Sequence, residues 1–268
     1  MLKDITLGQY FPGNSFIHRL DPRTKILMVI VYIVTLFMAG GWVSYGLMFA
    51  FLACAIRIST IAPKAFIKGM KPLVMILAFT AILNLFFTQE GTVLLDVWIV
   101  TITTGGINRA LMMMARILML ISCSFLLTYT TSPISLTDGL ESLLGPLKKI
   151  GVPVHELTMM MCIALRFIPT LIEETDKIMS AQKARGADFE TGSLMERAKA
   201  LIPILVPLFI SAFRRADELA TAMECRCYQG GGGRTKMKQL HYRRGDMVAF
   251  GSGAVLAAAV LLLGQFGL

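Results

Sequence analysis

Lys183-Ala184-Arg185-Gly186-Ala187 is the stretch around which this chain is arranged, together with a second one, Glu224-Cys225-Arg226-Cys227-Tyr228. Each places one arginine between small residues, and each closes a long, half-apolar helical pattern. Both lie within residues 130–246, which form the large polar region of the sequence. We therefore expect the two arginines to stand at helix ends, where another protein can reach them.

The helical patterns that precede these two stretches share one plan. Val154–Ala184 is apolar in its first half and charged in its second, and Gly186 is a typical helix stop. Met195–Cys227 begins polar, becomes apolar and turns charged again before its arginine. The apolar parts contain three prolines that are expected to kink them: Pro169, Pro203 and Pro207. The sequence predicts two long helices, each with an arginine at its C-terminal end.

The composition indicates a membrane protein. Only 16% of the 268 residues are charged, against about 25% in a soluble domain. Five apolar runs are candidate spans, although the first two are short against the roughly 20 residues that a span needs. They are Ile26–Gly41, Val43–Ile56, Pro72–Phe87, Ile107–Tyr129 and Met247–Leu268. The first two form a predicted helical hairpin around Gly40-Gly41-Trp42, and Asp21-Pro22 is a typical helix start.

The positive charges give the predicted orientation. Of the 26 Lys and Arg, four lie in residues 1–25, four in 57–71 and sixteen in 130–246, and the predicted outer loops carry none. This pattern places the N-terminus inside and, with five spans, the C-terminus outside. The predicted domains are then 1–129 with four transmembrane helices, a cytoplasmic domain over 130–246, and a last transmembrane helix over 247–268. In the outer loop 88–106, the pieces 93–95 and 97–100 are expected to re-enter the membrane interface.

Several kinds of chemistry are disfavoured by the residues present. The glycines at 230–233 precede Arg234 but lack the order of a phosphate-binding loop, so we interpret them as a hinge. The Cys225-x-Cys227 pair has no matching partner for a metal site, and no catalytic set converges. The basic residues do not gather with aromatics as they do in nucleic-acid binding. We expect no enzyme, no metal, no cofactor and no nucleic acid; any ATP would be bound by partner ATPases.

The apolar runs contain none of the seventeen Asp and Glu. A secondary transporter coupled to an ion usually keeps carboxylates along its path, so this absence favours a scaffold. Arg116 is the one deeply placed charge, and we expect it to snorkel or to pair with a carbonyl, with an anionic ligand as the alternative. A self-contained secondary transporter and a non-transport membrane anchor or assembly protein remain the competing functions.

The methionines cluster. Met159, Met160 and Met161 open the first long helical pattern, and Met112 and Met113 lie in the fourth apolar run. Ordinary core packing explains such clusters in an apolar chain. The alternative is an adaptable docking surface for several related membrane partners.

The paired arginine stretches also have two readings. A basic residue at a helix C-terminus is favoured by the helix dipole alone. Two of them at matching ends of matching helices favour docking, because a guanidinium can donate two hydrogen bonds to a partner carboxylate. The predicted docking residues are Ala184, Arg185, Gly186, Cys225, Arg226 and Cys227.

The whole chain resembles the transmembrane T component of energy-coupling factor (ECF) importers and its cobalt-transport relative. The resemblance rests on the stretch His18–Lys25, on Ala184-Arg185-Gly186, and on Cys225–Gly231. It implies an all-α integral membrane protein with about five transmembrane helices and two long cytoplasmic or interfacial coupling helices that cross in an X. The second arginine stretch departs from Ala-Arg-Gly by having cysteine on both sides.

The resemblance also implies partners and a role. Arg185 and Arg226 would each dock on one of two ABC-type ATPase subunits, and a separate substrate-binding S component would pack on the other side. The sequence leaves open whether that S component is dedicated or one of several interchangeable ones; the methionine clusters, as a docking surface, favour a shared one. The chain would be a non-catalytic coupling subunit in the lipid bilayer of a bacterial or archaeal cytoplasmic membrane. It would transmit ATP-driven motion for vitamin or metal-ion uptake, and the separate subunit would select the substrate.

Overall fold

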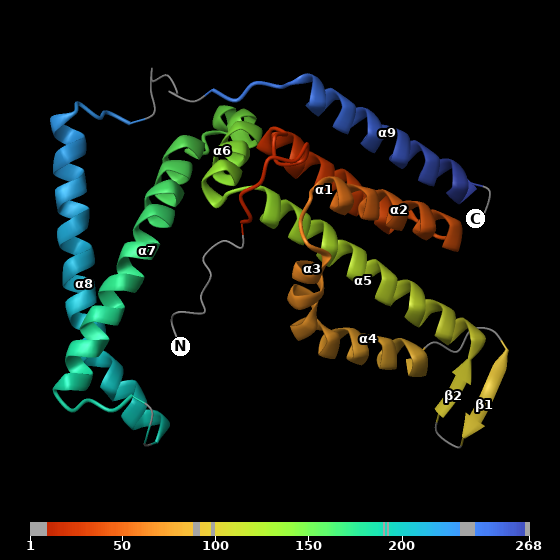
Figure 1. Cartoon of the computed structure of the whole chain (residues 1–268), viewed down its shortest axis with the longest axis horizontal. Helices are drawn as coiled ribbons and strands as arrows, with labels where there is room; N and C mark the ends of the chain where they lie inside the picture. The colour runs from red at the N-terminus through yellow and green to blue at the C-terminus, as the bar shows by residue number, and fades with distance from the viewer. Residues whose placement is uncertain are drawn as a thin grey trace. The chain divides into compact units, whose positions relative to one another are not determined.

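The computed structural model describes residues 10–87, 92–97, 100–189, 191, 193–230 and 239–265. Within these residues the chain is helical apart from one two-stranded hairpin (Figure 1). It divides into two compact units. One runs to Ser142 and resumes at Leu240, and we call it the membrane bundle; the other takes Leu143 to Gln239 and holds both arginine stretches.

The prediction of an all-helical membrane protein is confirmed. By length and composition, four helical segments of the described chain are long and apolar enough to cross a membrane, and Trp42–Ile58 is a shorter apolar helix. The four are Pro63–Phe86, Thr104–Thr130, Val154–Ala184 and Arg244–Gln265. Val154–Ala184 belongs to this set through its apolar half, although the sequence predicts it as a coupling helix.

The first two helices form the predicted hairpin. α1 is Pro22–Met38 and α2 is Trp42–Ile58, 17 residues each, so each is about 26 Å long and slightly short of the roughly 30 Å hydrocarbon core. α1 begins where the sequence indicates. Its N-cap is Asp21, whose carboxylate accepts a hydrogen bond from the backbone N–H of Arg23 at 2.9 Å.

The next apolar segment is bent. α3 (Pro63–Met70) meets α4 (Val74–Phe87) through the short 3-10 turn η2 (Lys71–Leu73), and the two helices change direction there (Figure 1). Pro72 lies in this turn, and a proline removes a backbone donor and favours such a bend. The predicted span Pro72–Phe87 is therefore α-helical only from Val74.

The loop whose apolar pieces are predicted to re-enter the membrane interface contains a β-hairpin. β1 (Val93–Val97) pairs with β2 (Val100–Thr103) in antiparallel register, with Val97 opposite Val100. Trp98 and Ile99 lie outside the described residues. The hairpin leads directly into α5 (Thr104–Thr130), whose N-cap Thr103 accepts a hydrogen bond from the N–H of Gly106.

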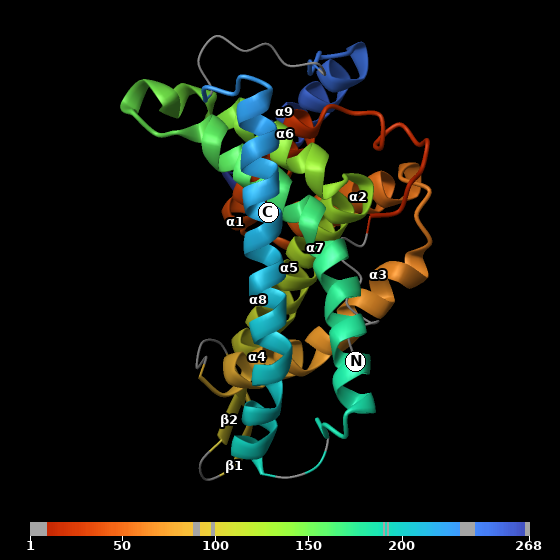
Figure 2. The ribbon, with the colours of Figure 1, turned by 90° about the vertical axis from the view of Figure 1, so that its left-hand side faces the viewer.

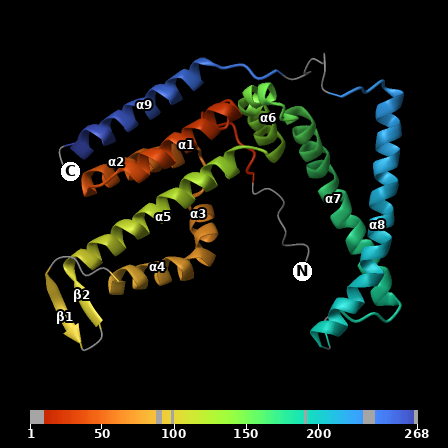
Figure 3. The same ribbon diagram turned by 180° about the vertical axis from the view of Figure 1, so that it is seen from behind.

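The core of the membrane bundle lies between α1, α2, α5 and α9 (Arg244–Gln265). In two opposite views α1 and α2 lie between α9 and α5 (Figures 1 and 3). The buried cluster draws side chains from all four helices: Tyr32, Leu36, Tyr45, Met48, Leu52, Met119, Cys123, Leu256 and Val260. α6 (Pro133–Leu144) follows α5.

The second unit contains the two long helices. α7 is Val154–Ala184, with the predicted bounds, and α8 is Leu194–Cys225. Ser193 caps α8 in a capping box with Glu196, which explains why the helix starts there. A 3-10 turn, η3 (Gly145–Ile150), precedes α7. The two helices cross (Figures 1 and 3), and both run along the vertical when viewed from the side (Figure 2).

Candidate functional site

The first arginine occupies the C-cap of α7. The N–H of Gly186 donates to the carbonyl of Lys183 at 3.0 Å, and the N–H of Ala187 donates to the carbonyl of Gln182 at 3.0 Å. These two bonds define a Schellman turn, which requires a left-handed residue after the C-cap. Gly186 supplies it with φ +87°. Glycine is therefore needed here for its backbone, and Arg185 is held one residue before it.

The second arginine occupies the same position in the same turn. The N–H of Cys227 donates to the carbonyl of Glu224 at 2.8 Å, and the N–H of Tyr228 donates to the carbonyl of Met223 at 3.0 Å. Cys227 takes the left-handed conformation with φ +57°, which costs a residue with a Cβ about 1–2 kcal/mol. Two stretches with different residues thus build one backbone geometry around an arginine.

The helix ends that carry Arg185 and Arg226, which we call the arginine tips, are both exposed to solvent. All six predicted docking residues are exposed: Ala184, Arg185, Gly186, Cys225, Arg226 and Cys227. Within the described part of the chain, the guanidinium groups of Arg185 and Arg226 have no hydrogen-bond or ion-pair partner, although the backbone N–H of each arginine donates to its own helix. The last carbonyls of a helix give its C-terminus a partial negative charge, which favours a cationic side chain there. Each guanidinium keeps its donors free, and such a group can form a bidentate pair with a carboxylate.

The crossing of α7 and α8 is held by polar contacts. The carboxylate of Glu174 accepts a hydrogen bond from Nη2 of Arg215 at 2.9 Å and another from the hydroxyl of Ser211. The pair is partly exposed, so it contributes at most about 1 kcal/mol. The main effect of this ion pair is to fix the register of α7 against α8.

A further contact at the crossing depends on proline. The side-chain amide of Gln182 donates to the backbone carbonyl of Pro203 at 3.3 Å. In a regular helix that carbonyl would accept from the residue four positions later, but Pro207 has no N–H. The sequence predicts kinks from these prolines; the structure adds that one of them frees an acceptor for the neighbouring helix.

The contacts show that the helices run antiparallel, because Glu174 meets Arg215 while Gln182 meets Pro203. The two C-termini consequently lie at opposite ends of the pair (Figures 1 and 3). At 1.5 Å per residue, Arg185 and Arg226 are at most about 40 Å apart along the helices. This separation suits two docking positions better than a single shared one.

The methionines predicted to dock a partner differ in exposure. On α7, Met160 and Met161 are exposed at 55% and 44%, and Met159 is half-buried. On α5, Met113 is exposed, whereas Met112 packs against the buried core of the membrane bundle. The two clusters belong to different units. Their docking role stays a prediction, and Met112 also serves ordinary core packing.

The intramembrane Arg116 is paired within the bundle. Its Nε donates to the hydroxyl of Tyr45 at 2.8 Å, and the guanidinium lies 5.4 Å from the ring centroid of Phe37 and 5.7 Å from that of Tyr45. Both kinds of contact stabilise a cation away from water. The contacts observed for Arg116 are thus a hydroxyl and two aromatic faces, where the sequence led us to expect either snorkelling or a carbonyl partner.

The stretch before α1 ties distant parts of the membrane bundle together. The backbone N–H of Asp21 donates to Oδ1 of Asp246 at 2.9 Å, and Oδ2 of Asp246 accepts from the N–H of Arg243 at 2.7 Å. Arg23 pairs with Asp21 at 3.2 Å and lies over the ring of Tyr242, 4.3 Å from its centroid. The N-terminus of α9 is thereby fixed to the N-terminus of α1.

Lys25 extends the same junction to the end of α5. Its Nζ donates to the carbonyls of Thr130 at 2.9 Å and His18 at 3.3 Å and to the hydroxyl of Thr131 at 3.2 Å. Three donors meet three acceptors, so the buried ammonium is fully hydrogen-bonded. From this stretch the sequence predicted a helix start at Asp21-Pro22 and a family resemblance, but it assigned no role to Asp246 or Tyr242.

Comparison with known proteins gives one consistent result. A family model described as cobalt transport protein (CbiQ) matches residues 13–238. Three relatives carry the name energy-coupling factor transporter transmembrane protein EcfT. The protein of Ruminiclostridium cellulolyticum is 52% identical over 98% of both chains. That of Acidaminococcus fermentans is 54% identical over 98% of this chain and 97% of its own, and that of Bacillus subtilis is 46% identical over 98% and 99%.

Proposed function

The chain belongs to the CbiQ family of cobalt transport proteins, and from that membership we propose that it is the transmembrane coupling subunit of an energy-coupling factor importer. The observation that carries the proposal is the repeated Schellman turn, which places Arg185 and Arg226 in one backbone geometry at opposite ends of the crossed α7 and α8. Stabilisation by the helix dipole alone would explain a basic residue at a helix end, but it would not require the same backbone turn at both ends.

The partners follow from this geometry. Each arginine tip docks on one of two ABC-type ATPase subunits, where a carboxylate receives the guanidinium. ATP is bound and hydrolysed by those subunits, and this chain takes no part in the chemistry. A substrate-binding S component, one of several interchangeable ones, docks on the exposed methionines of α7, whose flexible side chains can adapt to different surfaces.

The proposed mechanism is a transfer of motion. ATP binding closes the two ATPase subunits and moves one arginine tip relative to the other. The crossing contacts of Glu174 and Gln182 convey this motion to the apolar parts of α7 and α8, where the S component binds. The complex lies in the cytoplasmic membrane of a bacterial or archaeal cell, with the N-terminus and both long helices inside and the C-terminus outside, as the positive-inside count predicts.

The test is co-purification with a candidate pair of ABC ATPases expressed in the same cell. Wild type is compared with Arg185→Glu/Arg226→Glu, which reverses both tips, and with Arg197→Glu/Lys199→Glu, which reverses two exposed charges near the start of α8. We expect the tip variant to lose the ATPases and the control to retain them. Equal capture by the folded tip variant would show that the arginines are helix-end charges only.

A further inference from the structure

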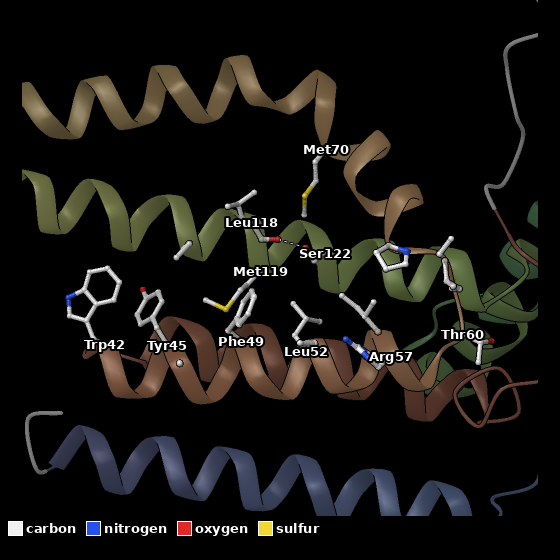
Figure 4. A pocket seen from close by; sticks show the side chains of 17 residues that line it. Trp42, Tyr45, Phe49, Leu52, Arg57, Thr60, Met70, Leu118, Met119 and Ser122 are labelled. Carbon is white, nitrogen blue, oxygen red and sulfur yellow. Dashed lines mark hydrogen bonds between the residues drawn. The ribbon is translucent and has the colours of Figure 1, made fainter.

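A long hollow runs along α2 in the membrane bundle. Its volume is about 920 Å³, and it lies between α2, α5 and the start of α3 (Figure 4). Its walls are mostly apolar, with Phe49 and Leu52 from α2 facing Leu118 of α5. Trp42 stands near one end, and Arg57 lies toward the other, where the lining continues to Thr60 (Figure 4). They lie roughly 22 Å apart along the helix, more than half of the roughly 30 Å hydrocarbon core.

A second hollow of about 510 Å³ adjoins the first, because Met70 and Leu118 line both. Met70 projects from the bent α3–α4 segment toward α5 (Figure 4). Met70 thus lies between two adjoining hollows, one on each side of its side chain. A ligand with two flexible apolar chains fits such a divided space, whereas one rigid helix does not.

Positively charged residues line both hollows. Arg57 lines the larger one, and three lysines line the smaller one: Lys64, Lys68 and Lys71. Their spacing puts the lysines on one helical face. None of the described residues that line either hollow is acidic. These four cations also have no ion-pair partner within the described ranges, so the site has a net positive charge that no described residue neutralises.

The membrane supplies a ligand of this chemistry. Anionic phospholipids combine a phosphate with two acyl chains, and they are enriched in the cytoplasmic leaflet, where each nearby Lys or Arg strengthens binding roughly fivefold. The positive-inside count places the Arg57 end of α2 on that side. A free phosphate has no apolar chains to pack against the apolar walls, and a neutral lipid has no net negative charge to pair with the four cations.

We propose that the two hollows bind one anionic phospholipid, with its phosphate between Arg57 and Lys64 and its acyl chains on either side of Met70. The site lies within the membrane bundle and is distinct from the arginine tips, so it goes beyond the coupling role and does not depend on it. The bound lipid would fill the space between α2 and the bent α3–α4 segment and fix their separation.

Native mass spectrometry of the full chain in a neutral detergent tests the proposal. The protein is titrated with dioleoyl phosphatidylglycerol and, separately, with dioleoyl phosphatidylcholine. We expect one phosphatidylglycerol to remain bound at concentrations where phosphatidylcholine does not. The variant Arg57→Gln/Lys64→Gln/Lys68→Gln should lose roughly fivefold in affinity for each charge removed. Equal retention of the two lipids by wild type would overturn the proposal.

Two matched controls separate this site from general surface charge and from misfolding. Arg19→Gln/Lys148→Gln/Lys149→Gln removes three exposed charges elsewhere and should leave binding unchanged; an equal loss would mean that the lipid is held by overall charge. Gly46→Leu fills the larger hollow, since a Cβ at Gly46 meets nothing within 4 Å. It should lower binding several-fold, whereas Gly251→Leu, equally unobstructed on α9, should not. Unchanged binding in Gly46→Leu would contradict an acyl chain in the hollow.

Discussion

The side-chain amide of Gln182 donates a hydrogen bond to the backbone carbonyl of Pro203, 3.3 Å away, where α7 crosses α8. The carbonyl is available because Pro207 lacks the N–H that would otherwise bind it. This relationship couples three residues on two helices and makes the crossing dependent on a proline whose own side chain is exposed.

Gln182→Leu should weaken the crossing by about 0.5–1 kcal/mol, because the Pro203 carbonyl loses its donor. In a Pro207→Ala background the same substitution should have little effect, since the alanine introduced there supplies a backbone N–H to that carbonyl. Thermal unfolding of the four proteins of this cycle in detergent gives the coupling energy. Additive effects of the two substitutions would show that Gln182 and Pro207 do not act on the same carbonyl.

Cys227→Gly should stabilise the turn after Arg226 by about 1 kcal/mol, because glycine adopts the left-handed conformation without the Cβ penalty. Cys225→Gly, two positions earlier and inside α8, should have the opposite sign and destabilise the helix end by about 0.5–1 kcal/mol. Hydrogen exchange of the peptide that spans both cysteines measures the difference. A loss of protection in both variants would show that Cys227 contributes through its side chain.

Asp246→Asn should destabilise the membrane bundle by about 2 kcal/mol. The buried carboxylate accepts hydrogen bonds from the N–H groups of Asp21 and Arg243, and an amide can accept only one of them without turning its own donors toward the other. Asp217→Asn, at an exposed position of α8, is the control and should stay within about 0.5 kcal/mol. Thermal unfolding in detergent compares the two, and equal melting temperatures would contradict the assigned role.

Tyr45 and Arg116 should show an interaction energy of about 1 kcal/mol in a double-mutant cycle of Tyr45→Phe and Arg116→Leu, because hydrogen bonds between membrane helices are of this size. Tyr45→Phe keeps the aromatic face and removes only the acceptor of the 2.8 Å bond. Equilibrium unfolding in mixed micelles gives the four free energies. A coupling near zero would indicate that the aromatic faces alone hold the arginine.

The sequence predicts those elements whose ends are marked by local chemistry. α7 has its predicted bounds because charged residues and Gly186 define its C-terminus, and α1 begins at Asp21-Pro22 because both residues favour a helix start. The strands at 93–103 were not predicted as a hairpin, because short apolar pieces without a clear period fit strand, helix or interface equally well.

The contacts between distant residues could not be predicted. Asp246 resembles an ordinary N-terminal acidic residue of α9, and only the fold brings it to the N–H of Asp21. The equivalence of the two arginine turns was likewise only partly visible, since Gly186 and Cys227 share a backbone conformation that their side chains do not reveal. The matching positions of Arg185 and Arg226 could be proposed from the sequence, whereas their matching hydrogen-bonded turns could not.

The antiparallel crossing also makes α7 and α8 a lever with unequal arms. Arg185 follows Gln182 within one helical turn, whereas Arg226 lies about three turns beyond Arg215, the crossing residue nearest to it. A rotation about the crossing therefore sweeps Arg226 through a larger arc than Arg185. Two helix ends with the same local geometry thus have different mechanical advantage, because a given rotation displaces Arg226 further, and with less force, than Arg185.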